Sequence, residues 1–432
     1  MLISTSILLC ATAVRALVVL GPPASHYRYY HYRRADIYNF TARFHDAANA
    51  SNERLVAVTD EVVQRNLTQL GMDDFLRASL DDIWMRDLFI TQLSPDRAVS
   101  FAYNPAYLSP LTIQFIDESR RALINATWPS ASGLVHDLNL VLDGGNIVWE
   151  PSTRRAVLTE RVLLDNPWLV GRTSLSQSGR LPGPNPLNGL PNAAPYADAL
   201  PIDASMVQTG TAAITALLST ALGGAAVTVA LVPEEPGVPR LGHIDGICNW
   251  LNPSTLALSS FANATVYAQY EGRLRAAFGS AVTIVPFPYH PVDETWIDGF
   301  ESSKGIYVNF ARTPHALYLP TFGIPADADA LARARAHADV PTVPVEASAV
   351  AIMGGSVRCL STVLWGAVAD AVVAHLVPPT VAATPSLNAG PIVGVAVGGA
   401  ALLVLLTGVG LARAAARRGA KHAASEQKEP VQ

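Results

Sequence analysis

The residues with the clearest chemical potential lie in the segment IMGGSVRC, residues 352–359. An apolar run breaks at two glycines and leaves a single cysteine, Cys359, at the head of another apolar stretch. A thiol presented in this way acts as a nucleophile when its surroundings favour the thiolate, which is the attacking species. The alternative is that Cys359 is a small buried hydrophobic residue, a common role of free cysteine.

A second segment, Gly242-His243-Ile244-Asp245-Gly246, supplies a base and an acid. The two side chains are two residues apart, so a strand would place them on one face. His243 is suited to move protons and Asp245 to hold a cation or orient a ring nitrogen. A zinc site is not expected, because His243 has no further histidine partners at a usable spacing.

Two further segments carry acids. In Trp84-Met85-Arg86-Asp87 a predicted strand places Asp87 on an apolar face, where a carboxylate needs a cationic partner. The alternative is a structural pair with Arg86 or a helix cap. In Asp143-Gly144-Gly145-Asn146 the paired glycines either let the backbone approach a ligand or make a tight hairpin turn.

Composition limits the class of protein. The chain has 432 residues, of which 50% are hydrophobic and 15% charged, with a formal net charge of -5. It can therefore bury a large core, and nucleic acid is not expected as a partner. With Cys10 in a predicted leader, only Cys248 and Cys359 remain, so the fold is not a disulfide scaffold. Either these two form a bridge or both are free thiols.

Both ends of the chain have the patterns of membrane targeting. Residues 1–16 are predicted to be a secretory signal peptide, because their apolar run is too short to span a bilayer. Residues 391–412 are predicted to form a transmembrane helix, since Ile392 to Ala412 is uncharged. Basic residues follow it, which places 413–432 in the cytoplasm. A removed lipid-anchor signal is the weaker alternative, because its hydrophobic tail should end the chain.

The expected product is a single-pass type I membrane protein with its large domain, 17–376, outside the cell or in a lumen. Residues 377–390, which contain three prolines, are predicted to be a juxtamembrane linker. Five Asn-x-Ser/Thr sequons agree with this route and predict loops that face water. They begin at Asn39, Asn49, Asn66, Asn125 and Asn263.

The large domain alternates short β-rich runs with helical stretches, which indicates an α/β fold. A unit of strand, helix, strand and a turn bearing glycine or acid recurs about five times. Residues 169–208, rich in Gly, Pro, Asn and Ser, are predicted to be a surface insertion. The predicted strands are 55–59, 83–93, 98–103, 139–149, 156–159, 227–232, 244–250, 255–258, 282–287, 306–310, 316–319 and 349–353. The predicted helices are 60–70, 114–126, 212–222, 268–277 and 327–338.

Taken together, these segments resemble the Porphyromonas-type peptidylarginine deiminase and agmatine deiminase family of the guanidino-group modifying superfamily. The match runs from about Val18 to Trp365 and also includes Tyr307-Val308-Asn309-Phe310 and Pro320-Thr321-Phe322-Gly323. The resemblance implies a five-bladed, pseudo-symmetric α/β propeller of the pentein type, with the active site at its centre. It also implies hydrolysis of a guanidinium to a ureido group plus ammonia, without a metal or an organic cofactor.

The resemblance further implies roles for individual residues. Cys359 attacks the central carbon, and His243 protonates the departing ammonia and later activates the water. Asp87 and Asp245 clamp the guanidinium, which agrees with the need of a buried planar cation for carboxylates opposite its N–H groups. Further substrate-binding positions are implied at Trp84, Asp143, Gly144, Gly145, Asn309 and Arg358.

The sequence departs from the agmatine enzymes, which typically have glutamate where this chain has Asp143 and histidine where it has Arg358. The insertion and the predicted anchor are also foreign to them. We therefore expect peptidyl-arginine as the substrate, with Arg358 or Arg161 as candidates to face a substrate carboxylate. Agmatine or free-arginine hydrolysis and amidinotransfer are the alternatives within the fold.

Two alternatives belong to other classes of protein. One is a catalytically silent propeller that serves as an adhesion or receptor ectodomain, which a bridge between Cys248 and Cys359 would favour. The other is a cysteine peptidase using Cys359 and His243, although two acids beside one cation site are unnecessary for peptide hydrolysis. The sequence predicts no oligomeric state.

Overall fold

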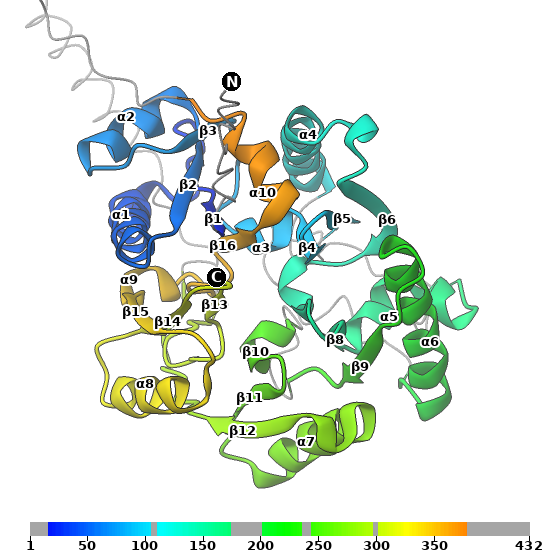
Figure 1. Cartoon of the computed structure of the whole chain (residues 1–432). Coiled ribbons are helices and arrows are strands. Elements are labelled where there is room, and N and C mark those ends of the chain that lie inside the picture. Colours follow the sequence, from blue (N-terminus) through cyan, green and yellow to red (C-terminus); the bar gives the residue numbers. More distant parts are fainter. Residues whose placement is uncertain (1–15, 105–109, 174–200, 236–242, 297–300, 378–432) are drawn as a thin grey trace, which may run out of the picture. The chain divides into compact units, whose positions relative to one another are not determined.

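The computed structural model describes residues 16–104, 110–173, 201–235, 243–296 and 301–377. In this part of the chain the strands form five small sheets around a common centre (Figure 1). In each sheet an inner strand pairs antiparallel with a middle strand, which pairs in parallel with an outer strand. From inner to outer, the sheets are β4 (Thr91–Ser94), β5 (Arg97–Ala102) and β6 (Val135–Val141); β7 (Val148–Glu150), β8 (Arg155–Thr159) and β9 (Thr228–Val232); β10 (Cys248–Asn252), β11 (Thr255–Ser259) and β12 (Thr283–Phe287); β13 (Ala311–Arg312), β14 (Leu317–Thr321) and β15 (Thr342–Glu346); and β16 (Ser361–Leu364), β1 (Leu17–Leu20), β2 (Arg54–Thr59) and β3 (Phe75–Arg77).

A long helix lies between the middle and the outer strand of every sheet, because parallel neighbours need a crossover connection rather than a tight hairpin. Figure 1 shows these helices on the outside of the ring. The repeated strand-helix-strand unit of the sequence is thus present, and the α/β propeller fits. The crossover helices are α1 (Arg34–Ala50), α4 (Pro110–Thr127), α6 (Ala204–Ala221), α7 (Ala264–Phe278) and α8 (Ala326–His337).

Shorter helices complete the described chain. The predicted helix 60–70 is α2 (Glu61–Gln69), and it begins where the Asp60 carboxylate accepts hydrogen bonds from the N–H groups of Val62 and Val63, both at 2.9 Å. The others are α3 (Met85–Leu88), α5 (Arg161–Asp165), α9 (Ser348–Ala351) and α10 (Gly366–Val373), with the 3-10 turns η1 (His31–Arg33), η2 (Ser130–Ser132), η3 (Gly144–Asn146), η4 (Pro167–Val170), η6 (Ile244–Gly246) and η7 (Gly279–Ala281).

The ring is closed by strands from opposite ends of the described chain. Strand β16 pairs antiparallel with β1, in a register that places Leu17 opposite Leu364 and Leu20 opposite Ser361. All four residues of β1 are buried. Closure therefore depends on an apolar segment that directly follows the predicted leader.

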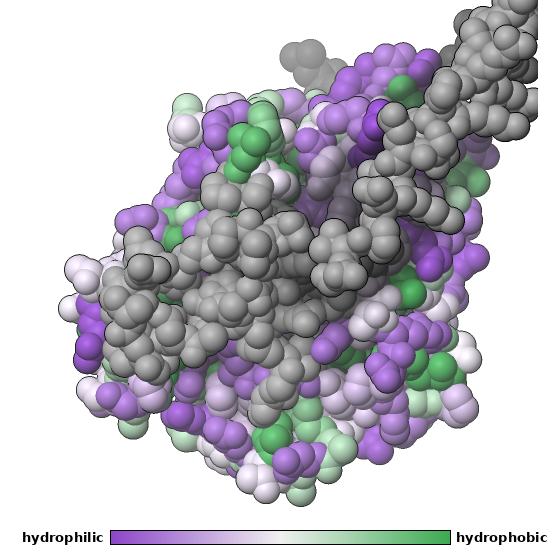
Figure 2. All heavy atoms as spheres, turned by 180° about the vertical axis from the view of Figure 1, so that it is seen from behind, coloured by the Kyte–Doolittle hydropathy of each residue, from purple (hydrophilic) through white to green (hydrophobic). Residues whose placement is uncertain are grey.

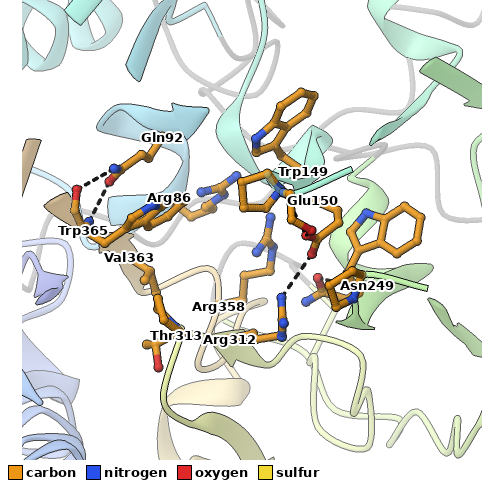
Figure 3. Close-up of a pocket in the computed structure, with 15 residues that line it drawn as sticks. Arg86, Gln92, Trp149, Glu150, Asn249, Arg312, Thr313, Arg358, Val363 and Trp365 are labelled. Carbon is orange, nitrogen blue, oxygen red and sulfur yellow. Dashed lines mark hydrogen bonds and ion pairs between the residues drawn. The ribbon is translucent and has the colours of Figure 1, made fainter. Parts of the chain in front are cut away.

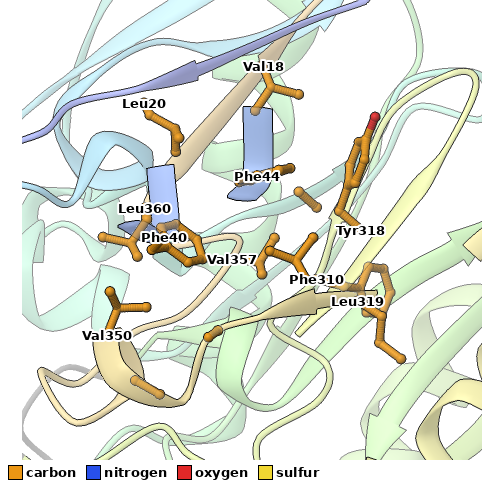
Figure 4. Packing of buried hydrophobic residues seen from close by; sticks show 14 of the residues in the cluster. Val18, Leu20, Phe40, Phe44, Phe310, Tyr318, Leu319, Val350, Val357 and Leu360 are labelled. Carbon is orange, nitrogen blue, oxygen red and sulfur yellow. The ribbon is translucent and has the colours of Figure 1, made fainter. Parts of the chain in front are cut away.

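Apolar packing also fixes the segment that carries Cys359. Its neighbours Val357 and Leu360 are buried in the same hydrophobic cluster as Phe310, which lies beside Asn309 (Figure 4). Phe44 of helix α1 and Tyr318 of β14 belong to this cluster, and their rings lie 5.0 Å apart. The core therefore anchors the backbone on both sides of the cysteine.

The predicted strands that carry the candidate site residues are wrong over part of their length. Residues 83–93, 139–149 and 244–250 each contain a short helical turn, α3, η3 or η6, before the inner strand begins. Residues 349–353 lie mostly in helix α9, and residues 306–310 precede β13 without forming a strand. Short apolar runs do not distinguish a strand from a helical turn, because both bury their side chains without a visible period.

The predicted membrane anchor and type I localisation need correction. No helix in the ranges that the structure describes is long and apolar enough to cross a membrane. The predicted span 391–412, the tail 413–432 and most of the linker 377–390 lie outside the described residues. On the face seen in Figure 2, apolar side chains are scattered in small groups among hydrophilic ones.

Other predicted boundaries fall partly outside the described residues. Of the predicted leader 1–16, only Ala16 is described, and it is buried beside β1. Residues 174–200 of the predicted insertion lie outside, whereas Leu169 and Val207 near its two ends are buried in one hydrophobic cluster. The five sequon asparagines are exposed, although four lie on helices rather than in loops.

Candidate active site

Five short segments meet at the centre of the ring, and each lies directly before the inner strand of one sheet. Because all inner strands border the common centre, residues at the same end of them come together. The segments carry Trp84 and Asp87 before β4, Asp143 to Gly145 before β7, His243 and Asp245 before β10, Asn309 before β13, and Cys359 before β16. The propeller symmetry thus assembles residues spread over most of the described chain.

Asn309 holds the Cys359 sulfur and its backbone. The Asn309 Nδ2 donates to the Cys359 Sγ at 3.0 Å, and the Asn309 Oδ1 accepts from the Cys359 N–H at 3.3 Å. The hydroxyl of Ser356 also donates to this Oδ1, at 3.0 Å. Both residues are buried, with 7% of Cys359 and 3% of Asn309 exposed. The sulfur is therefore fixed in position rather than free to rotate.

His243 lies between two carboxylates contributed by different sheets. Its Nε2 is 3.3 Å from the Asp143 Oδ2, and its Nδ1 is 3.9 Å from the Asp87 Oδ1. Asp87 also accepts a hydrogen bond from the Gly145 N–H at 2.7 Å. The imidazole and both acids are buried or nearly so, which makes their charges strongly interdependent.

Asp245 lies next to the cysteine. Its Oδ2 is 3.6 Å from the Cys359 Sγ, and 1% of the residue is exposed. The same oxygen is 3.5 Å from the Nε of Arg358, which is too long for a hydrogen bond but within the range of an ion pair. The thiol therefore faces at least two buried carboxyl groups, those of Asp245 and Asp87.

The electrostatics of the cluster suit a cation. Burial, reinforced by Asp245 and Asp87, raises the pKa of the Cys359 thiol well above its usual value. Burial is also the main reason that the pKa of Asp87 is raised to about 7. Burial opposes the charge of His243, but Asp87, Asp143 and Asp245 outweigh it and raise the pKa of His243 to about 9. A bound cation would favour both the thiolate and the ionised carboxylates.

Glycines allow the close approach of these groups. A Cβ atom on Gly145 would lie 2.5 Å from the His243 Nδ1 and 2.7 Å from the Asp87 Oδ1. One on Gly355 would lie 2.5 Å from the Trp84 ring and 2.7 Å from the Cys359 Cβ. One on Gly144 would overlap the carbonyl oxygen of Arg86, at 1.9 Å. The glycines are thus required by packing against the cluster, and the Trp84 ring lies beside the cysteine.

Some positions differ from the roles expected from the sequence. Arg86 does not pair with Asp87. Its side-chain Nε donates to the Gly144 carbonyl at 2.9 Å, and its backbone N–H donates to the Cys359 carbonyl at 3.1 Å. Arg358 lines a cavity that Cys359 does not line (Figure 3). Arg161 forms an ion pair with Glu234 at 2.9 Å.

Arg86, Ser356 and Gly355 are functional candidates that sequence reasoning did not assign a role. Each lies within a motif that was recognised, next to or near a named residue. Their types gave a signal: an arginine directly after the apolar run Ile83-Trp84-Met85 needs buried acceptors, and a glycine or serine before a cysteine leaves room for it. The contacts that they make depend on other sheets, which the sequence does not reveal.

The two cysteines of the described chain are free and buried. Cys248 lies in a hydrophobic cluster with Trp250 and Leu258, and burial raises the pKa of its thiol. Among the described residues, no group of three or more His, Cys, Asp or Glu side chains is arranged to hold a metal ion. The free thiols remove the observation that would have favoured a silent propeller.

Comparison with known proteins gives a family for part of the chain. Residues 208–364 match the family described as Porphyromonas-type peptidyl-arginine deiminase. Over this segment, which is less than half of the chain, the sequence is similar to that family. The predicted recognition and the prediction of a cysteine-dependent deiminase are thereby confirmed. No curated protein matches the chain.

Solved structures with low sequence identity share the fold. The agmatine deiminase of Enterococcus faecalis is 16% identical with a TM-score of 0.59, and the alignment covers 82% of this chain and 94% of that one. The agmatine deiminase of C. jejuni is 14% identical with a TM-score of 0.57 and the same coverage of both chains. A Porphyromonas gingivalis protein described as an arginine deiminase is 18% identical with a TM-score of 0.53, covering 81% of this chain and 95% of that one.

Proposed function

We propose that this deiminase converts the guanidinium of a peptidyl-arginine to a ureido group, which makes citrulline, and releases ammonia. One observation carries the proposal. The Cys359 sulfur lies 3.6 Å from the Asp245 carboxylate, in a buried cluster that also contains Asp87 and the His243 imidazole. A nucleophile, a proton donor and two carboxylates are the groups that hydrolysis of a planar cation requires.

In the first half of the reaction the carboxylates hold the guanidinium while the Cys359 thiolate forms a C–S bond to its central carbon. The adduct is neutral, because the thiolate charge offsets that of the cation. Protonated His243 then gives its proton to one nitrogen, the C–N bond breaks, and ammonia leaves. A thiouronium cation remains on Cys359, again opposite the carboxylates Asp87 and Asp245.

In the second half, water adds to the thiouronium carbon and His243 accepts a proton from it. The C–S bond breaks, the thiolate is regenerated, and the product loses its remaining proton to become a neutral ureido group. Atoms and charge balance, since a guanidinium and water give a ureido group and ammonium. Asn309 supports the departing thiolate through the hydrogen bond to its sulfur.

Two features favour peptidyl-arginine. The matched family is described as peptidyl-arginine deiminase, and Asp143 and Arg358 differ from the residues typical of agmatine enzymes. Agmatine is the second candidate, because agmatine deiminases are among the solved structures that share this fold. The catalytic cluster itself recognises only the guanidinium, which all of these substrates share.

The decisive experiment measures ureido product and ammonia from benzoyl-arginine amide, free arginine and agmatine at equal concentrations. We expect the highest kcat/KM with benzoyl-arginine amide, and no product with Cys359→Ala. Cys248→Ala is the matched control, because Cys248 is a buried free thiol outside the cluster. A preference for agmatine would support the second candidate.

Absence of product from all three compounds, with folded protein, would reject the catalytic assignment. A haloacetamidine, which carries a guanidinium-like head, gives an independent test. It should label Cys359 in preference to Cys248, and free arginine or a peptidyl-arginine should slow the labelling. Equal labelling of both thiols would show that the cluster does not concentrate a cation beside Cys359.

A further inference from the structure

A cavity of about 240 Å³ lies at the other end of the inner strands from the catalytic cluster (Figure 3). The catalytic segments precede these strands, whereas the cavity is lined by residues on or after them, such as Gln92 of β4, Glu150 of β7 and Arg312 of β13. Within the described chain, Cys359, His243 and the carboxylates of the cluster do not line it. The cavity is therefore distinct from the proposed substrate site.

Two arginines separate the cavity from the cluster. Arg86 and Arg358 are next in sequence to Asp87 and Cys359, yet their side chains line the cavity (Figure 3). Both guanidinium groups donate to one acceptor, the carbonyl oxygen of Ile147, at 3.1 Å from the Arg86 Nη2 and 2.9 Å from the Arg358 Nη2. Two positive charges, one buried and one partly buried, thus converge on a single neutral oxygen.

These charges are only partly compensated, since Arg358 lies 3.5 Å from the Asp245 Oδ2 but Arg86 lacks such a partner among the described residues. The other side-chain acceptor of Arg86 is the Gly144 carbonyl, and among the described residues Arg86 forms no ion pair. Burial, followed by repulsion from Arg358, lowers the pKa of Arg86 to about 9. Glu150, the carboxylate in the lining, is already paired with Arg312 at 3.1 Å and accepts hydrogen bonds from Ser152. A buried cation without an ion pair, such as Arg86, is costly, so the arrangement favours an anion.

The lining has further unsatisfied donors. The Trp250 Nε1, in a residue that is 2% exposed, and the Arg312 Nε are buried without a hydrogen-bond partner. Trp149 and Trp365 also line the cavity, and the Trp149 Nε1 donates to the carbonyl of Leu93 at 2.9 Å. The unpaired N–H groups belong to residues of the lining, and an anion that reached them would form charge-assisted hydrogen bonds.

We propose that this cavity binds a small oxyanion, a carboxylate or a phosphate, through Arg86 and Arg358. An oxyanion fits better than a spherical halide, because two oxygens match the forked donors of a guanidinium. The bound anion would offset the repulsion between the two arginines directly behind Asp87 and Cys359. The inference concerns ligand binding and does not depend on the proposed substrate.

The test is thermal unfolding of the full chain during titration with sodium phosphate and, separately, sodium acetate, with sodium chloride at equal ionic strength as the reference. We expect a saturable rise of Tm by a few degrees with at least one oxyanion, because ligands that bind the native state stabilise it. The same titration should change tryptophan fluorescence with the same midpoint. The oxyanion that gives the effect identifies the ligand class.

Variants locate the site. Arg358→Met should weaken the apparent affinity roughly tenfold or more through the lost charge-assisted contact. Arg275→Met, which removes an exposed arginine paired with Glu271, should leave the affinity unchanged. If Arg358→Met fails to fold, Val363→Glu is the second variant, because it places a carboxylate in the lining and should abolish the response to added anion. Identical responses to chloride and both oxyanions, or a full response in Arg358→Met or Val363→Glu, would overturn the proposal.

Discussion

The side chain of Asn309 binds Cys359 at two points, through its amide nitrogen to the sulfur at 3.0 Å and through its oxygen to the backbone N–H at 3.3 Å. This hydrogen bond to the sulfur lowers the pKa of the thiol, against the dominant effect of burial. Asn309→Ala should therefore reduce kcat by about 10- to 100-fold, since a hydrogen bond to a charged group contributes about 1.5–3 kcal/mol. The variant should also shift the pH dependence of Cys359 alkylation to higher pH.

The alkylation profile separates thiolate stabilisation from a merely structural role. If Asn309→Ala lowered kcat while the pH dependence of alkylation stayed that of the wild type, the contact with the sulfur would not be functional. Asn252→Ala is a suitable control, because Asn252 is an outward asparagine whose amide donates to the carbonyl of His337. It should leave both measurements unchanged.

A methyl group on Gly145 tests the packing between the base and the acid. A Cβ atom there would lie 2.5 Å from the His243 Nδ1 and 2.7 Å from the Asp87 Oδ1, so one of these groups must move. Because a displacement near 1 Å can cost about a hundredfold in rate, Gly145→Ala should lower kcat/KM by about that factor. Gly246→Ala is the matched control, since a Cβ atom at Gly246 meets no atom within 4 Å. Equal activity of the two variants would contradict the geometry.

The pH dependence of kcat/KM follows from the groups of the free enzyme. Asp87, with a pKa of about 7, must be ionised to hold the cation. The thiol has a pKa well above its usual value and His243 one of about 9, so at pH 7 the thiol and the imidazole are both protonated. The reactive pair of thiolate and imidazolium therefore forms only when the thiol loses its proton. We expect log kcat/KM to rise with a slope up to about two below pH 7 and about one from pH 7 to pH 9, then to level off. A flat profile between pH 6 and pH 9 would rule out these protonation states.

Stability should also depend on His243. Its pKa of about 9 in the folded chain exceeds the ordinary value of about 6.5, so the folded state binds more protons than the unfolded state between these values. This proton binding stabilises the folded state by on the order of 1–3 kcal/mol. The contribution of His243 to the free energy of unfolding is fully present below pH 6.5 and is lost as the pH rises through 9. Urea unfolding of the ligand-free protein at pH 6.5 and pH 9 should show this loss. His243→Gln should reduce it, and the exposed His337→Gln should not.

Much of the site could be predicted because its residues lie in short motifs with unusual composition. His243 and Asp245 flank a single residue, and Asp143 stands before paired glycines, so their chemistry was visible without the fold. Their local geometry was not, since a strand was expected where η6 forms. They converge because each segment precedes an inner strand of the ring, a relationship between sheets that local spacing cannot show.

Other features were hidden for physical reasons. Leu17–Leu20 continues the apolar composition of the predicted leader, and only pairing with β16 reveals it as a strand of the closed ring. Arg358 was one of two candidates to face a substrate carboxylate, but its side chain donates to the carbonyl of Ile147 and lines the cavity that Cys359 does not line. The direction of a side chain in an irregular segment depends on tertiary contacts, so neither case could be settled from periodicity.

The paired carboxylates Asp87 and Asp245 give the most direct test of cation binding. Asp87→Asn and Asp245→Asn each remove one charge and little volume, so the fold should persist while the buried guanidinium loses a partner. The loss in kcat/KM should be at least about a hundredfold for each, because breaking a buried ion pair costs about 3–5 kcal/mol. Asp82→Asn is the matched control, since Asp82 is also buried but accepts hydrogen bonds from the Tyr30 hydroxyl and the Ile83 N–H, both at 2.7 Å. Circular dichroism checks the fold of all three variants, and near-normal turnover in either cluster variant would remove that aspartate from the clamp.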